Sequence, residues 1–203
     1  MSSRRRLGLL LFPGFELLDV FGPAEMFGQL RDDLELVTVA ATAGPVASAQ
    51  GPAAVADHGY AACPELEWIL VPGGIGTRRS VDDPELVAWL RRRAAAAAVT
   101  MTVCTGTALL ARTGLLDGHR ATTNKRAFDW VVQQGPNVEW IRRARWVEDG
   151  TFATSSGVTA GIDMALAIIE REFGAEVARQ IELGTEYERH RDPNWDPFAD
   201  VHA

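Results

Sequence analysis

The first apolar segment of the chain contains no polar side chain. Residues Leu7 to Phe12 are apolar or glycine, and Pro13-Gly14 ends the run. A run of this length without polar alternation is typical of a strand that is buried on both faces of a sheet. Comparable strands are predicted at Glu35–Ala41, Trp68–Val71 and Val99–Val103.

Helical segments separate these strands. The sequence predicts helices at Pro23–Arg31, at Thr107–Leu115 and after Asp83, where an acidic N-cap is followed by proline at the first helical position. The segment Val46–Val55 predicts a hairpin or an irregular connection.

The second half of the chain has shorter predicted strands and two long helices. The tail from Asp192 is rich in proline and aromatic residues, which indicates an extended C-terminal arm over residues 191–203. Strands are predicted at Ala121–Thr123, Ala144–Val147 and Thr151–Thr154, and helices at Arg126–Gln133, Ala160–Phe173 and Ala175–His190.

Strands that alternate with helices through short connections predict an α/β fold with a mainly parallel sheet. No linker or repeat interrupts the chain, so we expect one domain over residues 1–203. In such sheets, binding sites form beyond the carboxyl ends of the strands. This rule selects three segments: Pro13–Asp19, Pro72–Gly76 and Cys104–Gly106.

Composition and charge narrow the class of protein. With 47% hydrophobic and 23% charged residues, the 203-residue chain has the composition of a soluble globular protein. A net charge of -7 leads us to expect no nucleic-acid partner. No apolar run approaches the ~20 residues of a membrane span, and the first one is too short for a signal peptide. Two cysteines do not suggest a disulfide framework, so we expect a cytoplasmic location.

Cys104 is the first candidate for chemistry. A predicted strand delivers it to a turn from which a helix begins at once, and this geometry exposes the side chain at the sheet edge in a nucleophile elbow. Free N–H groups at a helix start lower the pKa of a thiol. The alternative is a buried structural cysteine, the usual state of a free cysteine.

Three further residues join Cys104 in the predicted site. The amides of Gly74 and Thr105 could hold a developing negative charge, although Pro72-Gly73-Gly74 could also be a plain turn. Asp19 is a carboxylate among apolar neighbours, which favours a raised pKa and proton transfer. Alternatively, Asp19 or Gly22 caps a helix that begins at Pro23.

Histidine and metal chemistry receive no support from the sequence. None of the four histidines is adjacent to Cys104, so no cysteine–histidine pair is visible. No metal-ligand spacing and no glycine-rich phosphate loop is present, so we expect neither a metal nor a cofactor.

Several motifs together resemble the ThiJ/PfpI family, which has the class I glutamine amidotransferase-like fold. They are Pro72-Gly73-Gly74, Val103-Cys104-Thr105-Gly106, Leu18-Asp19-Val20-Phe21-Gly22-Pro23 and Ser156–Asp163. The resemblance implies a flavodoxin-like three-layer sandwich with helices on both faces, and a homodimer. Within the family the pattern is most similar to the isonitrile hydratases, although Asn124-Lys125 replaces a His-Trp pair of the hydratases that we compare.

The resemblance implies a cysteine-dependent hydratase, a hydro-lyase, that converts an isonitrile to an N-substituted formamide through a covalent thioimidate. Cys104 would be the nucleophile and Asp19 the proton-transfer group, with Gly74 and Thr105 positioning charge or water. One alternative is a glyoxalase or deglycase that acts on 2-oxoaldehydes. Another is a sensor in which Cys104 is oxidised without turnover; DNA binding through a helix-turn-helix extension is not expected.

Overall fold

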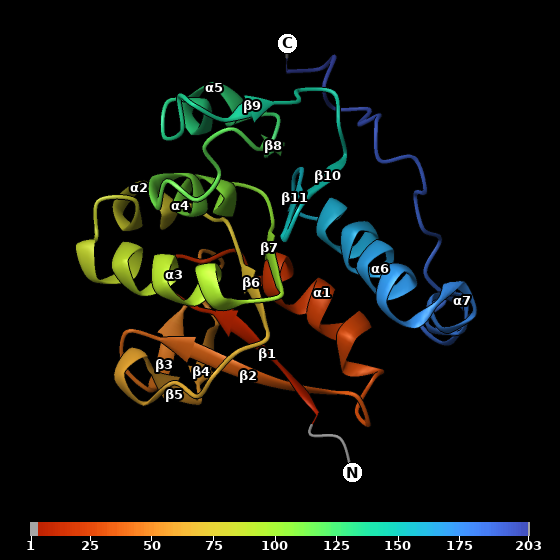
Figure 1. Ribbon diagram of the computed structural model, residues 1–203, viewed down its shortest axis with the longest axis horizontal. Coiled ribbons are helices and arrows are strands. Elements are labelled where there is room, and N and C mark those ends of the chain that lie inside the picture. Colours follow the sequence, from red (N-terminus) through yellow and green to blue (C-terminus); the bar gives the residue numbers. More distant parts are fainter. Residues whose placement is uncertain (1–3, 203) are drawn as a thin grey trace.

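A single sheet dominates the computed structural model, which describes residues 4–202. Residues 1–3 and 203, which the predicted domain and arm include, lie outside the described residues. The strand order in the sheet is β10-β11-β7-β6-β1-β2-β5 (Figure 1). The strands are β1 (Arg5–Leu10), β2 (Leu34–Ala40), β5 (His58–Gly59), β6 (Trp68–Val71), β7 (Val99–Thr102), β10 (Trp146–Asp149) and β11 (Phe152–Ser155).

Neighbouring strands in this sheet are parallel, with one exception. β10 pairs antiparallel with β11 at the edge, while β6, β1 and β7 run in the same direction through the centre. All residues of β6 and β7 are buried. Such complete burial requires layers on both faces, which explains the apolar texture of these segments. The predicted α/β class and mainly parallel sheet are confirmed.

The helices cover the two faces of the sheet. α1 (Leu17–Gly28), α6 (Ala160–Phe173) and α7 (Ala175–Gly184) pack together on one side, and α2 (Thr77–Ser80), α3 (Pro84–Ala96) and α4 (Gly106–Arg112) lie on the other (Figure 1). This is the three-layer sandwich of flavodoxin-like folds.

No helix between residues 4 and 202 is long and apolar enough to cross a membrane. The remaining elements are the hairpin β3 (Gly44–Ala47) and β4 (Ala53–Ala56), a 3-10 helix (Tyr60–Ala62), the small sheet of β8 (Arg120–Ala121) and β9 (Glu139–Trp140), and α5 (Phe128–Val132).

The first helix begins earlier than the sequence pattern predicts. It starts at Leu17 and ends at Gly28, so Pro23 lies inside it and Glu16 occupies the N-cap position. The alternative in which Asp19 or Gly22 caps a helix at Pro23 is therefore wrong. A proline inside a helix removes one backbone hydrogen bond. Packing of α1 along α6, with Pro23 buried, compensates for that loss.

The last helix ends earlier than predicted. α7 ends at Gly184 rather than His190, because the Thr185 hydroxyl donates to the Ile181 carbonyl and Glu186 adopts a left-handed φ of 52°. Edge elements also shift: β10 begins two residues later than predicted, and Ala121 pairs with β9 rather than joining the main sheet. Short strands carry little periodicity, so their limits depend on the partners that they meet.

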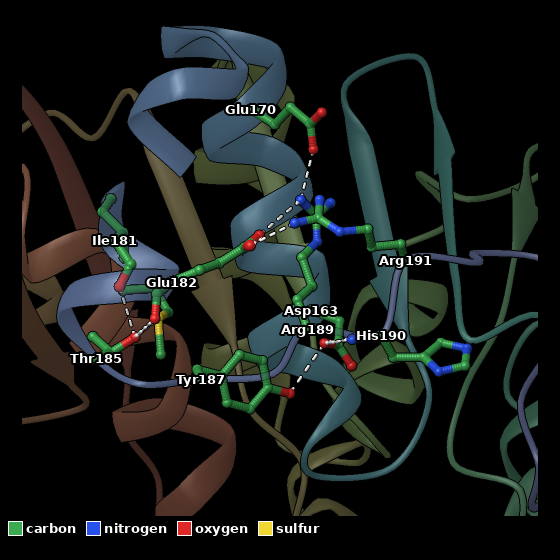
Figure 2. Close-up of polar contacts among 10 residues, drawn as sticks. Asp163, Glu170, Ile181, Glu182, Thr185, Tyr187, Arg189, His190 and Arg191 are labelled. Atoms are coloured by element: carbon green, nitrogen blue, oxygen red, sulfur yellow. Dashed lines mark hydrogen bonds and ion pairs between the residues drawn. The ribbon is translucent and has the colours of Figure 1, made fainter. Parts of the chain in front are cut away.

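A buried carboxylate on α6 holds the segment that follows α7. Asp163 accepts hydrogen bonds from the Tyr187 hydroxyl at 3.0 Å and from the His190 amide at 2.9 Å (Figure 2). The Arg145 guanidinium pairs with the same carboxylate at 2.6 Å and lies 3.7 Å from Asp196. Through these bonds the residues after α7, which form no helix or strand up to residue 202, are tied to the core.

Substitution of Asp163 by alanine should strongly destabilise the fold. It leaves the buried Arg145 charge without its closest partner, which typically costs about 3–5 kcal/mol. Urea denaturation of the full chain measures this loss. Asp129→Ala removes an exposed ion pair with Arg142 and is the matched control, expected to change stability by less than about 1 kcal/mol. Equal losses of stability in the two variants would show that the buried Asp163 contacts contribute no more than an exposed ion pair.

Candidate active site

Cys104 lies in a strained turn between β7 and α4. Its φ is 57°, in the left-handed region that non-glycine residues rarely adopt, and α4 begins two residues later. Such a conformation costs on the order of 1–3 kcal/mol and persists where the surrounding structure imposes it. The predicted strand–turn–helix order is confirmed, but the Cys104 side chain is buried rather than exposed at the sheet edge. The loop at Ser156 lies against the turn and covers it.

Two glycines allow the elbow to approach the end of β6. A Cβ on Gly106 would lie 2.4 Å from the Val71 carbonyl oxygen, and a Cβ on Gly73 would lie 2.6 Å from the Thr105 nitrogen. Side chains at either position would push the two segments apart. The same imagined Cβ on Gly73 would lie 2.9 Å from Asp19 Oδ2, so three of the predicted segments converge at this point.

Asp19 is fully buried in the first turn of α1. Its Oδ2 accepts a hydrogen bond of 2.8 Å from the Gly73 amide. Burial, together with the nearby charge of Glu16, raises the pKa of Asp19 from 3.8 to about 7, against the opposing effects of the Gly73 amide and the Cys104 thiol. The second oxygen, Oδ1, has no well-aligned partner among residues 4–202. Hydrogen bonds between catalytic groups are often poorly aligned before substrate binds.

The pKa of the Cys104 thiol is raised, not lowered as the sequence predicts, because burial outweighs the amides at the start of α4. Burial, followed by the negative charge of Asp19, raises its pKa to about 12, while the amides of Thr105 and Val158 and the Thr105 hydroxyl favour the thiolate. The sulfur therefore keeps its proton at neutral pH, beside a carboxyl group that titrates near neutrality. This arrangement suits transfer of the thiol proton to Asp19 as the sulfur forms a bond.

Gly74 and Thr105 contact each other as well as the elbow. The Gly74 amide donates to Thr105 Oγ1 at 3.1 Å, and the Thr77 hydroxyl lies 3.1 Å from the same oxygen. The Gly74 amide, predicted to face a developing charge, is thus engaged in holding the Thr105 side chain. The Thr105 amide favours the thiolate form of Cys104.

Val158 is a site residue that the sequence analysis did not select. Its amide lies near enough to the Cys104 sulfur to favour the thiolate, and its φ of 26° is unusual for a β-branched residue. The Ser156 carbonyl oxygen accepts a hydrogen bond of 3.0 Å from the Cys104 amide, and this bond fixes the loop against the elbow. The motif Ser156–Asp163 marked the segment, but no local pattern showed that it would reach Cys104.

A small cavity of about 210 Å³ lies beside this loop and is closed partly by the C-terminal segment. Asn124 lines it, with its Oδ1 accepting from the Ala127 amide. Lys125 also borders it, but its ammonium group turns inward to the Thr122 hydroxyl and the Ala144 carbonyl. No group of three potential metal ligands comes together within residues 4–202. The other lining residues are Arg126, Ser156, Gly157, Val158, Thr159, Phe198 and His202.

Comparison with known proteins identifies the family. Residues 5–171 match the DJ-1/PfpI family. The chain belongs to the DJ-1/PfpI family. This confirms the resemblance that the motifs indicate, because ThiJ/PfpI and DJ-1/PfpI denote the same family.

Among its DJ-1/PfpI relatives is isonitrile hydratase of Pseudomonas putida. The two are 35% identical over 90% of this chain and 78% of the hydratase. A ThiJ/PfpI family protein from Pseudomonas syringae, 32% identical, superposes with a TM-score of 0.85 over 93% of this chain and 77% of that protein.

DJ-1/PfpI domains also occur in proteins of other kinds. The HTH-type transcriptional regulator GbdR of Pseudomonas aeruginosa is 33% identical over 91% of this chain, but this chain spans only 51% of the regulator. Drosophila melanogaster DJ-1beta superposes with a TM-score of 0.79 over 92% of this chain and 100% of that chain, at 19% identity, which shows a shared fold alone. The family therefore sets the architecture, and the site must indicate the activity.

Replacement of Asp19 by asparagine should change how stability depends on pH. A carboxyl whose pKa is raised by folding stabilises the native state below its unfolded pKa, and this contribution is lost as pH rises through the folded value. For Asp19 the window runs from about 3.8 to about 7, and the loss reaches roughly 4 kcal/mol. In urea denaturation, the free energy of unfolding of Asp19→Asn minus that of the parent should increase as pH rises from 4 to 8. A constant difference across this range would contradict a buried acid at this position.

Proposed function

We propose that this protein is a cysteine-dependent hydratase that converts an isonitrile into an N-substituted formamide. The observation that carries the proposal is the buried Asp19 carboxyl beside the Cys104 thiol, with one oxygen free of a well-aligned partner in the described chain. The relation to isonitrile hydratase supports the same chemistry. The substrate is a small molecule, and neither a metal nor a cofactor is required.

In the first step, Cys104 Sγ bonds to the terminal carbon of the isonitrile. Asp19 accepts the thiol proton as the bond forms and delivers it to the same carbon, which gives a thioimidate with a carbon–nitrogen double bond. The amides of Thr105 and Val158 stabilise the negative charge that passes through the sulfur. Gly74 contributes indirectly, because its amide holds the Thr105 side chain.

In the second step, water adds across the carbon–nitrogen double bond of the thioimidate. Asp19 orients the water and relays one of its protons to the nitrogen, while the oxygen bonds to the carbon. The carbon–sulfur bond then breaks as the hydroxyl group loses its proton, which returns to the sulfur. The formamide leaves, and both side chains regain their original protonation.

Formamide production from a panel of alkyl and aryl isonitriles tests the proposal. Cys104→Ala and Asp19→Asn should each lower kcat/KM by about 100-fold or more, whereas Cys63→Ala, which replaces the other free cysteine, should not. In the parent protein, kcat/KM should rise as pH increases through about 7, because the carboxylate form of Asp19 receives the thiol proton.

Other outcomes of this assay would redirect the assignment. A fully active Asp19→Asn variant would rule out the proposed proton transfer. Cysteine-dependent consumption of methylglyoxal, with no formamide from any isonitrile, would favour a glyoxalase or deglycase. Stable Cys104 sulfinic acid under mild peroxide, with no turnover of either substrate, would favour an oxidation sensor.

We extend the proposal to a homodimer in the cytoplasm. Leu18 and Phe21 leave large apolar side chains exposed on α1, the helix that carries Asp19, and a second copy would cover them. A reducing compartment would keep the Cys104 thiol free for attack. Sedimentation velocity at micromolar concentration tests the assembly, and a monomer would contradict it.

A further inference from the structure

Arg78 is a shielded cation that has no counter-charge. Its guanidinium makes no hydrogen bond or ion pair with any residue from 4 to 202, and its Nη1 is buried. Two other shielded arginines, Arg145 and Arg189, both pair with carboxylates. Partial removal of a guanidinium from water without a partner costs free energy, so the Arg78 charge calls for an explanation.

Trp130 holds this guanidinium in place. The Arg78 guanidinium carbon lies 3.3 Å from the centroid of the Trp130 ring, so the planar group stacks on the indole. Arg78 lies on α2 and Trp130 on α5, two short helices that contact α4 and follow different strands of the fold. A stacked guanidinium has fixed direction, and its remaining N–H groups are presented in a rigid fork.

This pair lies at the edge of the proposed active site. Thr77, the residue before Arg78, hydrogen-bonds to the Thr105 hydroxyl beside Cys104. The Arg78 and Cys104 charges lie near enough to interact, since a thiolate at Cys104 opposes the lowering of the Arg78 pKa that burial causes. An oriented positive charge therefore lies close to the thiol at which a substrate would be bound.

We propose that Arg78, held against Trp130, binds a carboxylate of the substrate, so that the preferred substrates are isonitriles that carry a carboxylate group. The choice of isonitriles rests on the proposed function, whereas the carboxylate site rests on Arg78 and Trp130 alone. A guanidinium fork matches the two oxygens of a carboxylate. The local cation would also offset repulsion of an anionic substrate by Asp19, Glu16 and the net charge of -7.

A matched pair of substrates tests the charge requirement. Isocyanoacetate and its methyl ester share a skeleton and differ in the carboxylate. The parent protein should show a kcat/KM at least about tenfold higher for the acid, as expected for a charge-assisted hydrogen bond. Arg78→Gln should reduce this preference to about one and leave ester turnover within roughly threefold, and Arg78→Lys should retain part of it. Arg79→Gln, at the exposed neighbour on α2, is the control and should keep the full preference.

Binding of the reaction product separates this inference from the proposed function. N-formylglycine and its methyl ester are titrated calorimetrically into Cys104→Ala protein, with and without Arg78→Gln. Preferential binding of the acid that depends on Arg78 would support the inference even if no isonitrile is hydrated. It would be overturned by equal binding of acid and ester, by an acid preference that survives Arg78→Gln, or by equal loss of both substrates in that variant. The last outcome would mean that Arg78 only supports the fold through Trp130.

Discussion

The hydrogen bond from the Gly73 amide to Asp19 is the contact on which the candidate site depends. It joins residues that are 54 positions apart and places a carboxyl from α1 against the loop that follows β6. The same loop touches the elbow after β7, because β6 lies between β1 and β7 in the sheet. One bond thus brings an acid and a thiol from separate halves of the α/β unit into the same buried space.

This burial creates a conflict between two acids. Desolvation favours the protonated form of both Asp19 and Cys104. The negative charge of Asp19 raises the pKa of Cys104 further, whereas a hydrogen bond with the thiol lowers the pKa of Asp19. The amides of Thr105 and Val158 favour the ionised form of the Cys104 sulfur. With pKa values of about 7 for Asp19 and about 12 for Cys104, the proton stays on the sulfur at rest. In the proposed reaction it moves to Asp19 only as the sulfur bonds to the isonitrile carbon.

The cysteine elbow and the acid on α1 form the proposed reaction centre, and other segments lie around it. Asn124, Val158 and the C-terminal segment border the cavity, and Arg78 with Trp130 forms a charged edge on the side of α2. These residues come from loops and short helices. Binding residues are commonly found in such segments on a rigid scaffold, where one fold supports many chemistries.

Local sequence determined the main architecture and the choice of Cys104 as the candidate nucleophile. Four short apolar runs, bounded by turn residues and separated by helices, indicated the strands of a sheet covered on both faces. The strand that leads into Cys104 and Gly106 indicated the elbow. Tertiary structure decided the rest. The limits of α1 followed from its packing on α6 despite Pro23, and the end of α7 from the side chain of Thr185. The approach of Val158 to the sulfur, the engagement of the Gly74 amide by Thr105 and the stacking of Arg78 on Trp130 join segments distant in the chain. No period or spacing encodes such contacts, because they arise only when the sheet sets its strands in order.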